Sequence, residues 1–241
     1  TFVYGFSAAL AVFLLGLAIG SAIYQRWLSH FNRPGILIGV SHILIGLSAL
    51  SAVVFIAFFM PLWIPHPLVR LISPIVVFLP LTVFSGIMFP ALSQIFNRSP
   101  NLGSSIGFIY AVNSLGSIAG SLLSGLILIP ALGSVAAVLF LAGINTTIGT
   151  LLIITQKNRL AFKPGLVIAG GVAISLSLWS LYQADSIFIP RYIKVVLNYH
   201  QQKWPDTSFV VKEDVVASIF ATTSKTRAGR KLLIDGVGTT S

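Results

Sequence analysis

The distribution of charge along the chain is the feature that most limits what it can fold into. No aspartate or glutamate occurs before Asp185, and all five acidic residues lie in the last quarter of the sequence. Only 8% of the 241 residues are charged, whereas a soluble domain carries about 25%. We therefore expect an integral membrane protein. The basic residues before Asp185 all stand between long apolar runs: Arg26, Arg33, Arg70, Arg98, Lys157, Arg159 and Lys163.

Six apolar segments are long enough, or nearly so, to cross a bilayer as helices, which requires about 20 residues. Proline, polar and basic residues separate most of them, as expected of loops. The sequence therefore predicts an all-α polytopic membrane bundle of about six transmembrane helices over residues 1–184. The segments cover residues 2–24, 35–60, 71–96, 102–131, 133–155 and 165–183.

Alternate loops between these segments differ in charge. The second and fourth loops hold only Arg70, and the other three hold six basic residues. Cytoplasmic loops carry an excess of lysine and arginine, so we expect the first, third and fifth loops to face the cytoplasm. With six spans, both chain ends then lie on the opposite side. The residues that set this topology are Arg26, Arg33, Arg98, Lys157, Arg159 and Lys163.

The composition changes to that of a soluble region after Asp185. Residues 185–205 are amphipathic and read as a linker along the membrane surface. Residues 206–241 contain three short runs rich in β-branched residues, "TSFVV", "VVASIFATT" and "KLLIDG", separated by charged or polar turns. This pattern predicts a small C-terminal antiparallel β-meander of three strands.

Small residues recur at three- or four-residue steps in the segment 102–131, and a GxxxG motif occurs in the first segment. Helix association in a bilayer depends on close backbone approach, so helix interfaces there favour glycine, alanine and serine. We therefore expect glycine to mark the helix-packing faces. The glycines concerned are Gly16, Gly20, Gly107, Gly116, Gly120 and Gly125.

Tyr110, Asn113 and His42 are the polar side chains inside the apolar segments that could contact a ligand. One interpretation is that they form hydrogen bonds between helices. The other is that they line a central cavity that binds a substrate. The first is favoured, because neutral polar groups are tolerated inside a bundle.

Other site chemistries are not supported by the sequence. There is no cysteine, and the four histidines are far apart without metal-ligand spacing, so we expect no metal site. The net charge of +10 raises the possibility of nucleic-acid binding, but the basic residues form no cluster in the membrane-like part. We expect the lipid bilayer to be a partner and nucleic acid not to be one. No catalytic or cofactor-binding residue is predicted in this chain.

Several motifs resemble a known family. The run "IGFIYAVNSLGSIAGSLLSGLILIPALG" at 106–133 resembles a signature of bacterial fused major-facilitator-like/spermidine synthase proteins. "FLLGLAIGSAIYQRWLSHFNRP" at 13–34 and "LTVFSGIMFPALSQIF" at 81–96 are similar to further segments of that family. "VVKEDVVASIFAT" and "RKLLIDGVGTTS" resemble the hairpins that open the aminopropyltransferase fold.

The resemblance implies that residues 206–241 begin a spermidine-synthase-like domain whose catalytic part is absent from this chain. In the family that part would bind decarboxylated S-adenosylmethionine as cofactor. The resemblance also implies the inner membrane of a bacterium as the location. Whether the protein is an enzyme is left open.

Three functions remain as alternatives. The leading one is a membrane-anchoring module of a polyamine aminopropyltransferase-like protein, without a complete active site in this chain. The second is a half-transporter of major-facilitator type for a small solute or polyamine, with Tyr110, Asn113 and His42 lining its cavity. The third is a non-catalytic accessory subunit of a larger membrane complex. We expect association with a second copy or with other membrane subunits.

Overall fold

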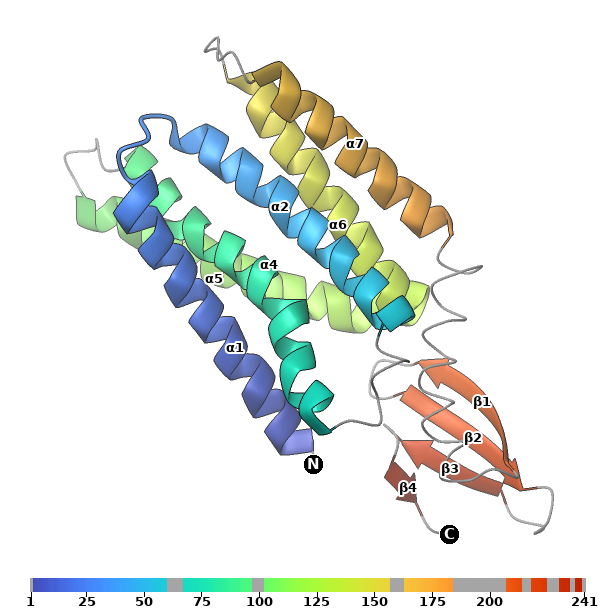
Figure 1. Cartoon of the computed structure of the whole chain (residues 1–241). Helices are drawn as coiled ribbons and strands as arrows, with labels where there is room; N and C mark the ends of the chain where they lie inside the picture. Colours follow the sequence, from blue (N-terminus) through green and yellow to red (C-terminus); the bar gives the residue numbers. More distant parts are fainter. Residues whose placement is uncertain are drawn as a thin grey trace.

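The computed structural model describes the helical residues 2–59, 67–96, 102–156 and 163–183, together with four backbone strands between residues 207 and 239. Each predicted apolar segment corresponds to one helix, with ends that differ by a few residues (Figure 1). The helices are α1 (Phe2–Ile23), α2 (Pro34–Val54), α4 (Pro67–Phe96), α5 (Leu102–Leu123), α6 (Ile129–Thr155) and α7 (Lys163–Tyr182). Single π-helical turns extend α1 to Leu28, α2 to Phe59 and α5 to Leu128.

Five helical stretches in the described residues are long and apolar enough to cross a membrane. The fourth, Gly103–Thr155, has 53 residues and contains both α5 and α6. A straight helix of that length would measure about 80 Å, far more than the ~30 Å hydrocarbon core. The chain instead turns at Gly133, where φ is 78° and ψ is 161°. The fourth stretch therefore forms two legs, which accounts for the prediction of about six spans.

Helix α4 continues through three prolines, Pro74, Pro80 and Pro90, and bends along its length (Figure 1). Proline has no N–H and so leaves the carbonyl four residues earlier without its helical partner. For Pro90 that carbonyl belongs to Gly86. The hydroxyl of Ser21 on α1 donates a hydrogen bond to the Gly86 oxygen at 3.1 Å. A neighbouring helix thus satisfies a carbonyl that a proline has freed, as membrane helices require.

Helix α2 forms the centre of the bundle and contributes to each of its three buried clusters. Leu50 and Val53 pack with Leu139 of α6 in the first cluster, and Ile38 packs with Ala91 of α4 in the second. In the third, residues from α2, α6 and α7 meet: Ile43, Ile153 and Ala173. Because α2 contacts helices on both sides, it fixes the arrangement of the bundle.

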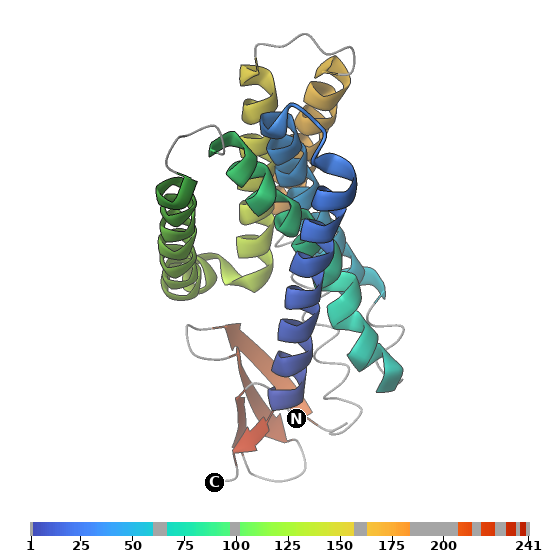
Figure 2. The ribbon, with the colours of Figure 1, turned by 90° about the vertical axis from the view of Figure 1, so that its left-hand side faces the viewer.

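Helix α5 lies apart from the other helices (Figure 2). Most of its described side chains are exposed, and among them only the Ile109 side chain is buried. The ring of Tyr110 on α5 packs edge-to-face against the ring of Phe89 on α4, with the ring centroids 5.5 Å apart. The helix with the densest pattern of small residues is therefore the one least packed by its own chain.

The predicted fold class, a helical bundle completed by a three-strand β-meander, is wrong. Where residues 2–183 are described they form helices and no strand, so the fold class is an all-α bundle. Beyond them, backbone segments pair in the antiparallel order β1-β2-β3-β4, with four strands in place of three. The strands are β1 (Thr207–Glu213), β2 (Ser218–Ser224), β3 (Arg230–Ile234) and β4 (Val237–Thr239).

The physical reason for this correction lies in what a small sheet needs. A few short strands are marginal unless their apolar face is covered. The described core clusters, which define the fold class, are formed by residues of the helices and their π-helical turns. The additional strand arises because Val237–Thr239 pairs back onto Leu232–Ile234. The predicted linker, residues 185–205, lies outside the described residues.

Candidate functional site

The predicted glycine pair of the first segment lies at the contact between α1 and α4. A Cβ added at Gly16 would overlap the side chain of Thr82, and one added at Gly20 would overlap the backbone oxygen of Val83. Gly86 completes this contact from α4, with its ideal Cβ position 2.9 Å from Leu17 Cα. The two backbones approach so closely that no larger residue fits at these positions.

A second glycine contact, which the sequence reasoning missed, joins α2 to α6. An added Cβ would lie 2.8 Å from Ile153 Cγ1 at Gly39 and 2.8 Å from the Ala142 oxygen at Gly46. At Gly149 it would lie 2.5 Å from the backbone oxygen of Gly39. The seven-residue spacing of Gly39 and Gly46 was the available signal, since residues seven apart share a helix face.

The four predicted packing glycines of the small-residue segment are placed differently. An added Cβ at these positions would meet no described atom of another helix or side chain within 4 Å. These glycines therefore contact no other helix among the described residues, and their predicted role in helix packing stays a prediction. They are Gly107, Gly116, Gly120 and Gly125.

His42 lies half-buried on α2 and faces Asn145 on α6, with 3.0 Å between His42 Nδ1 and Asn145 Oδ1. The Asn145 amide nitrogen donates to the Leu141 oxygen at 3.0 Å, which orients its own oxygen toward the imidazole. A neutral His42 therefore donates from Nδ1, an assignment made from the hydrogen-bond pattern. The arrangement is an interhelical hydrogen bond, as the first interpretation of this residue expects.

Tyr110 and Asn113 are not brought together with His42. Both lie on α5, where Tyr110 is 61% exposed and Asn113 is also exposed. The backbone oxygen of Asn113 accepts a hydrogen bond from the Ser117 hydroxyl at 2.8 Å within the same helix. The structure therefore gives the three predicted ligand contacts two separate environments, one between helices and one on the outer face.

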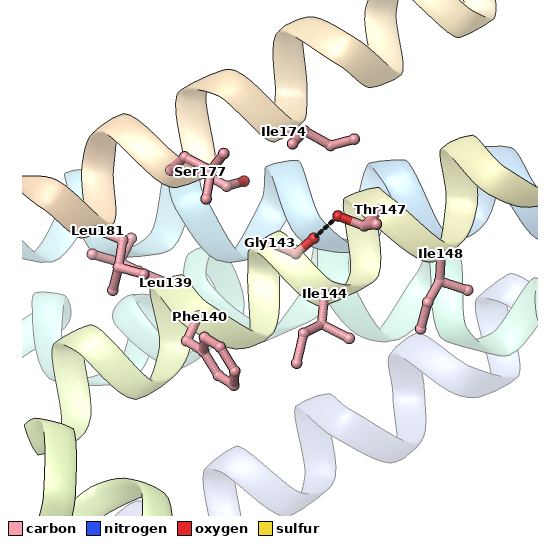
Figure 3. A pocket seen from close by; sticks show the side chains of 10 residues that line it. Leu139, Phe140, Gly143, Ile144, Thr147, Ile148, Ile174, Ser177 and Leu181 are labelled. Atoms are coloured by element: carbon pink, nitrogen blue, oxygen red, sulfur yellow. Dashed lines mark hydrogen bonds between the residues drawn. The ribbon is translucent and has the colours of Figure 1, made fainter.

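An apolar groove of about 280 Å³ runs between α6 and α7 (Figure 3). Its polar side chains are already bonded: Thr147 donates to the Gly143 oxygen and Ser177 to the Ala173 oxygen, both at 2.8 Å. With these donors occupied, the groove suits an apolar group such as an acyl chain. None of the predicted site residues lines it. The lining residues are Leu139, Phe140, Gly143, Ile144, Thr147, Ile148, Ile174, Ser177, Leu178 and Leu181.

Three of the basic residues predicted to set the membrane topology are described. They lie at one end of the bundle, where α2 and α7 begin and α1, α4 and α6 end (Figure 2). Arg26 is exposed on the π-helical turn after α1, Arg33 directly precedes α2, and Lys163 begins α7. Arg98, Lys157 and Arg159 lie outside the described residues.

No group of three or more histidine, cysteine, aspartate or glutamate side chains gathers as a metal site in the described part of the chain. In comparisons with known proteins, no family model, no curated protein and no solved structure matches this chain. The resemblance to fused major-facilitator-like/spermidine synthase proteins therefore rests on the motifs quoted above.

Proposed function

We propose that this chain is the membrane-anchoring module of a spermidine synthase-like protein, without a complete active site of its own. On this proposal the helices hold the C-terminal strands at the membrane. Decarboxylated S-adenosylmethionine and the polyamine would bind to a domain that is not in this sequence. The observation that carries the anchoring role is that the most deeply buried hydroxyls of the described helices are bonded to carbonyls of their own helices.

Three buried hydroxyls show this bonding. Thr82 on α4, Thr146 on α6 and Ser177 on α7 are at most 1% exposed, and each donates to a carbonyl of its own helix. A transport route through a membrane is marked by polar or ionisable groups that face the bundle interior or a water-filled cavity. These three hydroxyls are bonded within their own helices instead, which supports an anchor over the half-transporter.

The exposed helix α5 supports a version of this proposal in which a second membrane chain binds beside it. Glycine in a helix interior costs roughly 0.5–1 kcal/mol relative to alanine. Among the described residues, Gly116 and Gly120 have no close contact that would offset this cost. A neighbouring helix, from a second copy or another subunit, would use their small size.

We further propose that the chain lies in the inner membrane of a bacterium, with the end that carries Arg26, Arg33 and Lys163 in the cytoplasm. The positive-inside rule supports this orientation. Helix α7 has 20 residues, or about 30 Å, which matches one crossing. The strands would then lie on the side opposite to the basic loops.

The proposal is tested by expressing the full chain in bacteria, fused after Ser241 to a soluble fluorescent protein that also folds outside the cytoplasm. We expect the fluorescence to stay with the membranes after an alkaline wash. The matched control, the fluorescent protein fused to residues 207–241 alone, should be soluble. Release of the full fusion by the wash would refute the anchoring role.

A second measurement separates the anchor from the half-transporter. The purified chain in liposomes should take up no more labelled putrescine than empty liposomes, with or without a pH gradient. Uptake that exceeds the empty liposomes, and that is lost in His42→Leu, would contradict the proposal and favour transport.

A further inference from the structure

Arg33 carries a positive charge that the described chain leaves without a partner. Its side chain is partly buried, and its Nη1 is buried with no hydrogen-bond partner. Nearly all buried polar groups in proteins are hydrogen-bonded, and burial of an unpaired charge is strongly unfavourable. A buried, unpaired guanidinium nitrogen therefore points to a missing anion.

The described helices cannot supply that anion. Every residue described up to Gln183 precedes the first acidic residue, Asp185. A bound anion would provide the counter-charge that these helices lack.

The backbone around Arg33 adds to the attraction for an anion. Arg33 is the N-cap of the 21-residue helix α2, without a side-chain cap, and Pro34 has no N–H. The Arg33 oxygen accepts from the Ile36 and Leu37 nitrogens at 3.1 and 3.4 Å. These N–H groups are therefore already used, and the guanidinium has to supply the hydrogen bonds to a ligand. The dipole of the helix adds a partial positive charge at this end, which favours the same ligand charge as the guanidinium.

The residues beside Arg33 place it at the depth of the lipid headgroups. Trp27 is 67% exposed on the preceding turn, and exposed tryptophans gather at the membrane interface. Hydrogen bonds hold the start of this loop: Tyr24 donates to Gln94 Oε1 at 2.6 Å, and Gln94 Nε2 donates to the Ser29 oxygen at 3.2 Å. The loop that carries Arg33 is thereby tied to both α1 and α4.

We propose that Arg33 and the start of α2 bind the phosphate of an anionic phospholipid on the side of the basic loops. The planar guanidinium matches phosphate with paired hydrogen bonds, which lysine cannot form. This inference needs only the membrane location and is independent of the anchoring role.

The test uses the purified full chain in a non-ionic detergent and a phosphate-free buffer. Phosphatidylglycerol is titrated while the melting temperature is followed, and inorganic phosphate is titrated in a parallel sample. We expect phosphatidylglycerol to raise the melting temperature and inorganic phosphate to leave it unchanged. An equal rise with inorganic phosphate would overturn the lipid assignment in favour of a free anion.

Two matched variants separate the Arg33 site from general attraction to basic residues. Arg33→Gln should weaken the apparent Kd for phosphatidylglycerol by about tenfold or more, because a charge-assisted hydrogen bond is lost with the charge. Arg26→Gln removes the same charge from an exposed side chain and should weaken it by at most about fivefold. Equal weakening in both variants would overturn the proposal.

A third variant covers the case in which Arg33→Gln does not fold. Arg33→Lys keeps the charge and loses the planar fork, so native mass spectrometry of the folded protein should show fewer retained phosphatidylglycerol molecules than in wild type. Retention equal to that of wild type would also overturn the proposal.

Discussion

Replacing Gly149 with alanine should loosen the contact between α2 and α6. The new Cβ would lie 2.5 Å from the Gly39 oxygen and 2.8 and 2.9 Å from Ile43 Cγ1 and the Ile43 nitrogen. Comfortable separations between such atoms are roughly 3.5 Å, so the helices must move apart by about 1 Å. Two of the three nearest atoms belong to the backbone, so a change of side-chain rotamer cannot relieve the overlap.

The size of the effect follows from two opposing terms. Inserting a methyl group into a tightly packed interface costs about 1–3 kcal/mol. Alanine recovers up to about 1 kcal/mol through its better helix propensity. Because two of the three contacts are to backbone atoms, the upper part of the first range applies, and a net loss of about 1–2 kcal/mol remains. This loss should lower the melting temperature by roughly 2–8 °C for a chain of this length.

Gly171→Ala is the matched control, because an added Cβ at this position on α7 meets no described atom of another helix or side chain within 4 Å. It should leave the melting temperature unchanged or raise it slightly. The assay is thermal unfolding in non-ionic detergent, followed by tryptophan fluorescence and by the monomer peak in gel filtration. The expected loosening is refuted if Gly149→Ala melts at or above wild type, or if Gly171→Ala falls as far as Gly149→Ala.

Three further predictions use the same thermal assay. Ser21→Ala leaves the Gly86 oxygen unpaired and should cost about 1 kcal/mol of stability. In a Pro90→Ala background the alanine N–H can bond the Gly86 oxygen, so Ser21→Ala should cost much less there, and equal costs in both backgrounds would show that Ser21 does not satisfy this carbonyl. His42→Leu removes the bond to α6 and should cost about 0.6–1.7 kcal/mol, so an unchanged melting temperature would show that the bond contributes nothing. Gly133→Ala forces a side chain into a conformation that only glycine adopts readily and should cost about 1–3 kcal/mol, whereas a melting temperature equal to wild type would contradict the turn at this residue.

The helices could be predicted from the sequence because their signals are local. A run of about 20 apolar residues must form a helix in lipid, where every backbone polar group has to be bonded. Proline and basic residues mark the ends of such runs. The expected segment 133–155 begins four residues later than α6. The chain resumes an α-helix at Ile129, directly after the π-helical turn, and bends only at Gly133.

Helix pairing could not be predicted in the same way, because it depends on residues far apart in the sequence. Spacing shows that Gly16 and Gly20 share a face, but not that this face meets Thr82 and Gly86. The partner of His42, Asn145, lies 103 residues away. The small-residue pattern of α5 predicted close packing, yet the glycines of this pattern contact no other helix among the described residues. A pattern of this kind indicates that a face can pack closely without indicating what packs on it.

The central claim is that the bundle crosses the membrane with its basic end in the cytoplasm and the C-terminal end of α7 on the opposite side. The chain has no cysteine, so single cysteines can be placed without further changes. Asn32→Cys marks the exposed basic end, and Tyr182→Cys marks the end of α7, where the side chain is 84% exposed. In intact spheroplasts a membrane-impermeant maleimide should label Tyr182→Cys at once and Asn32→Cys only after lysis. Labelling of both cysteines from the same side would contradict the account.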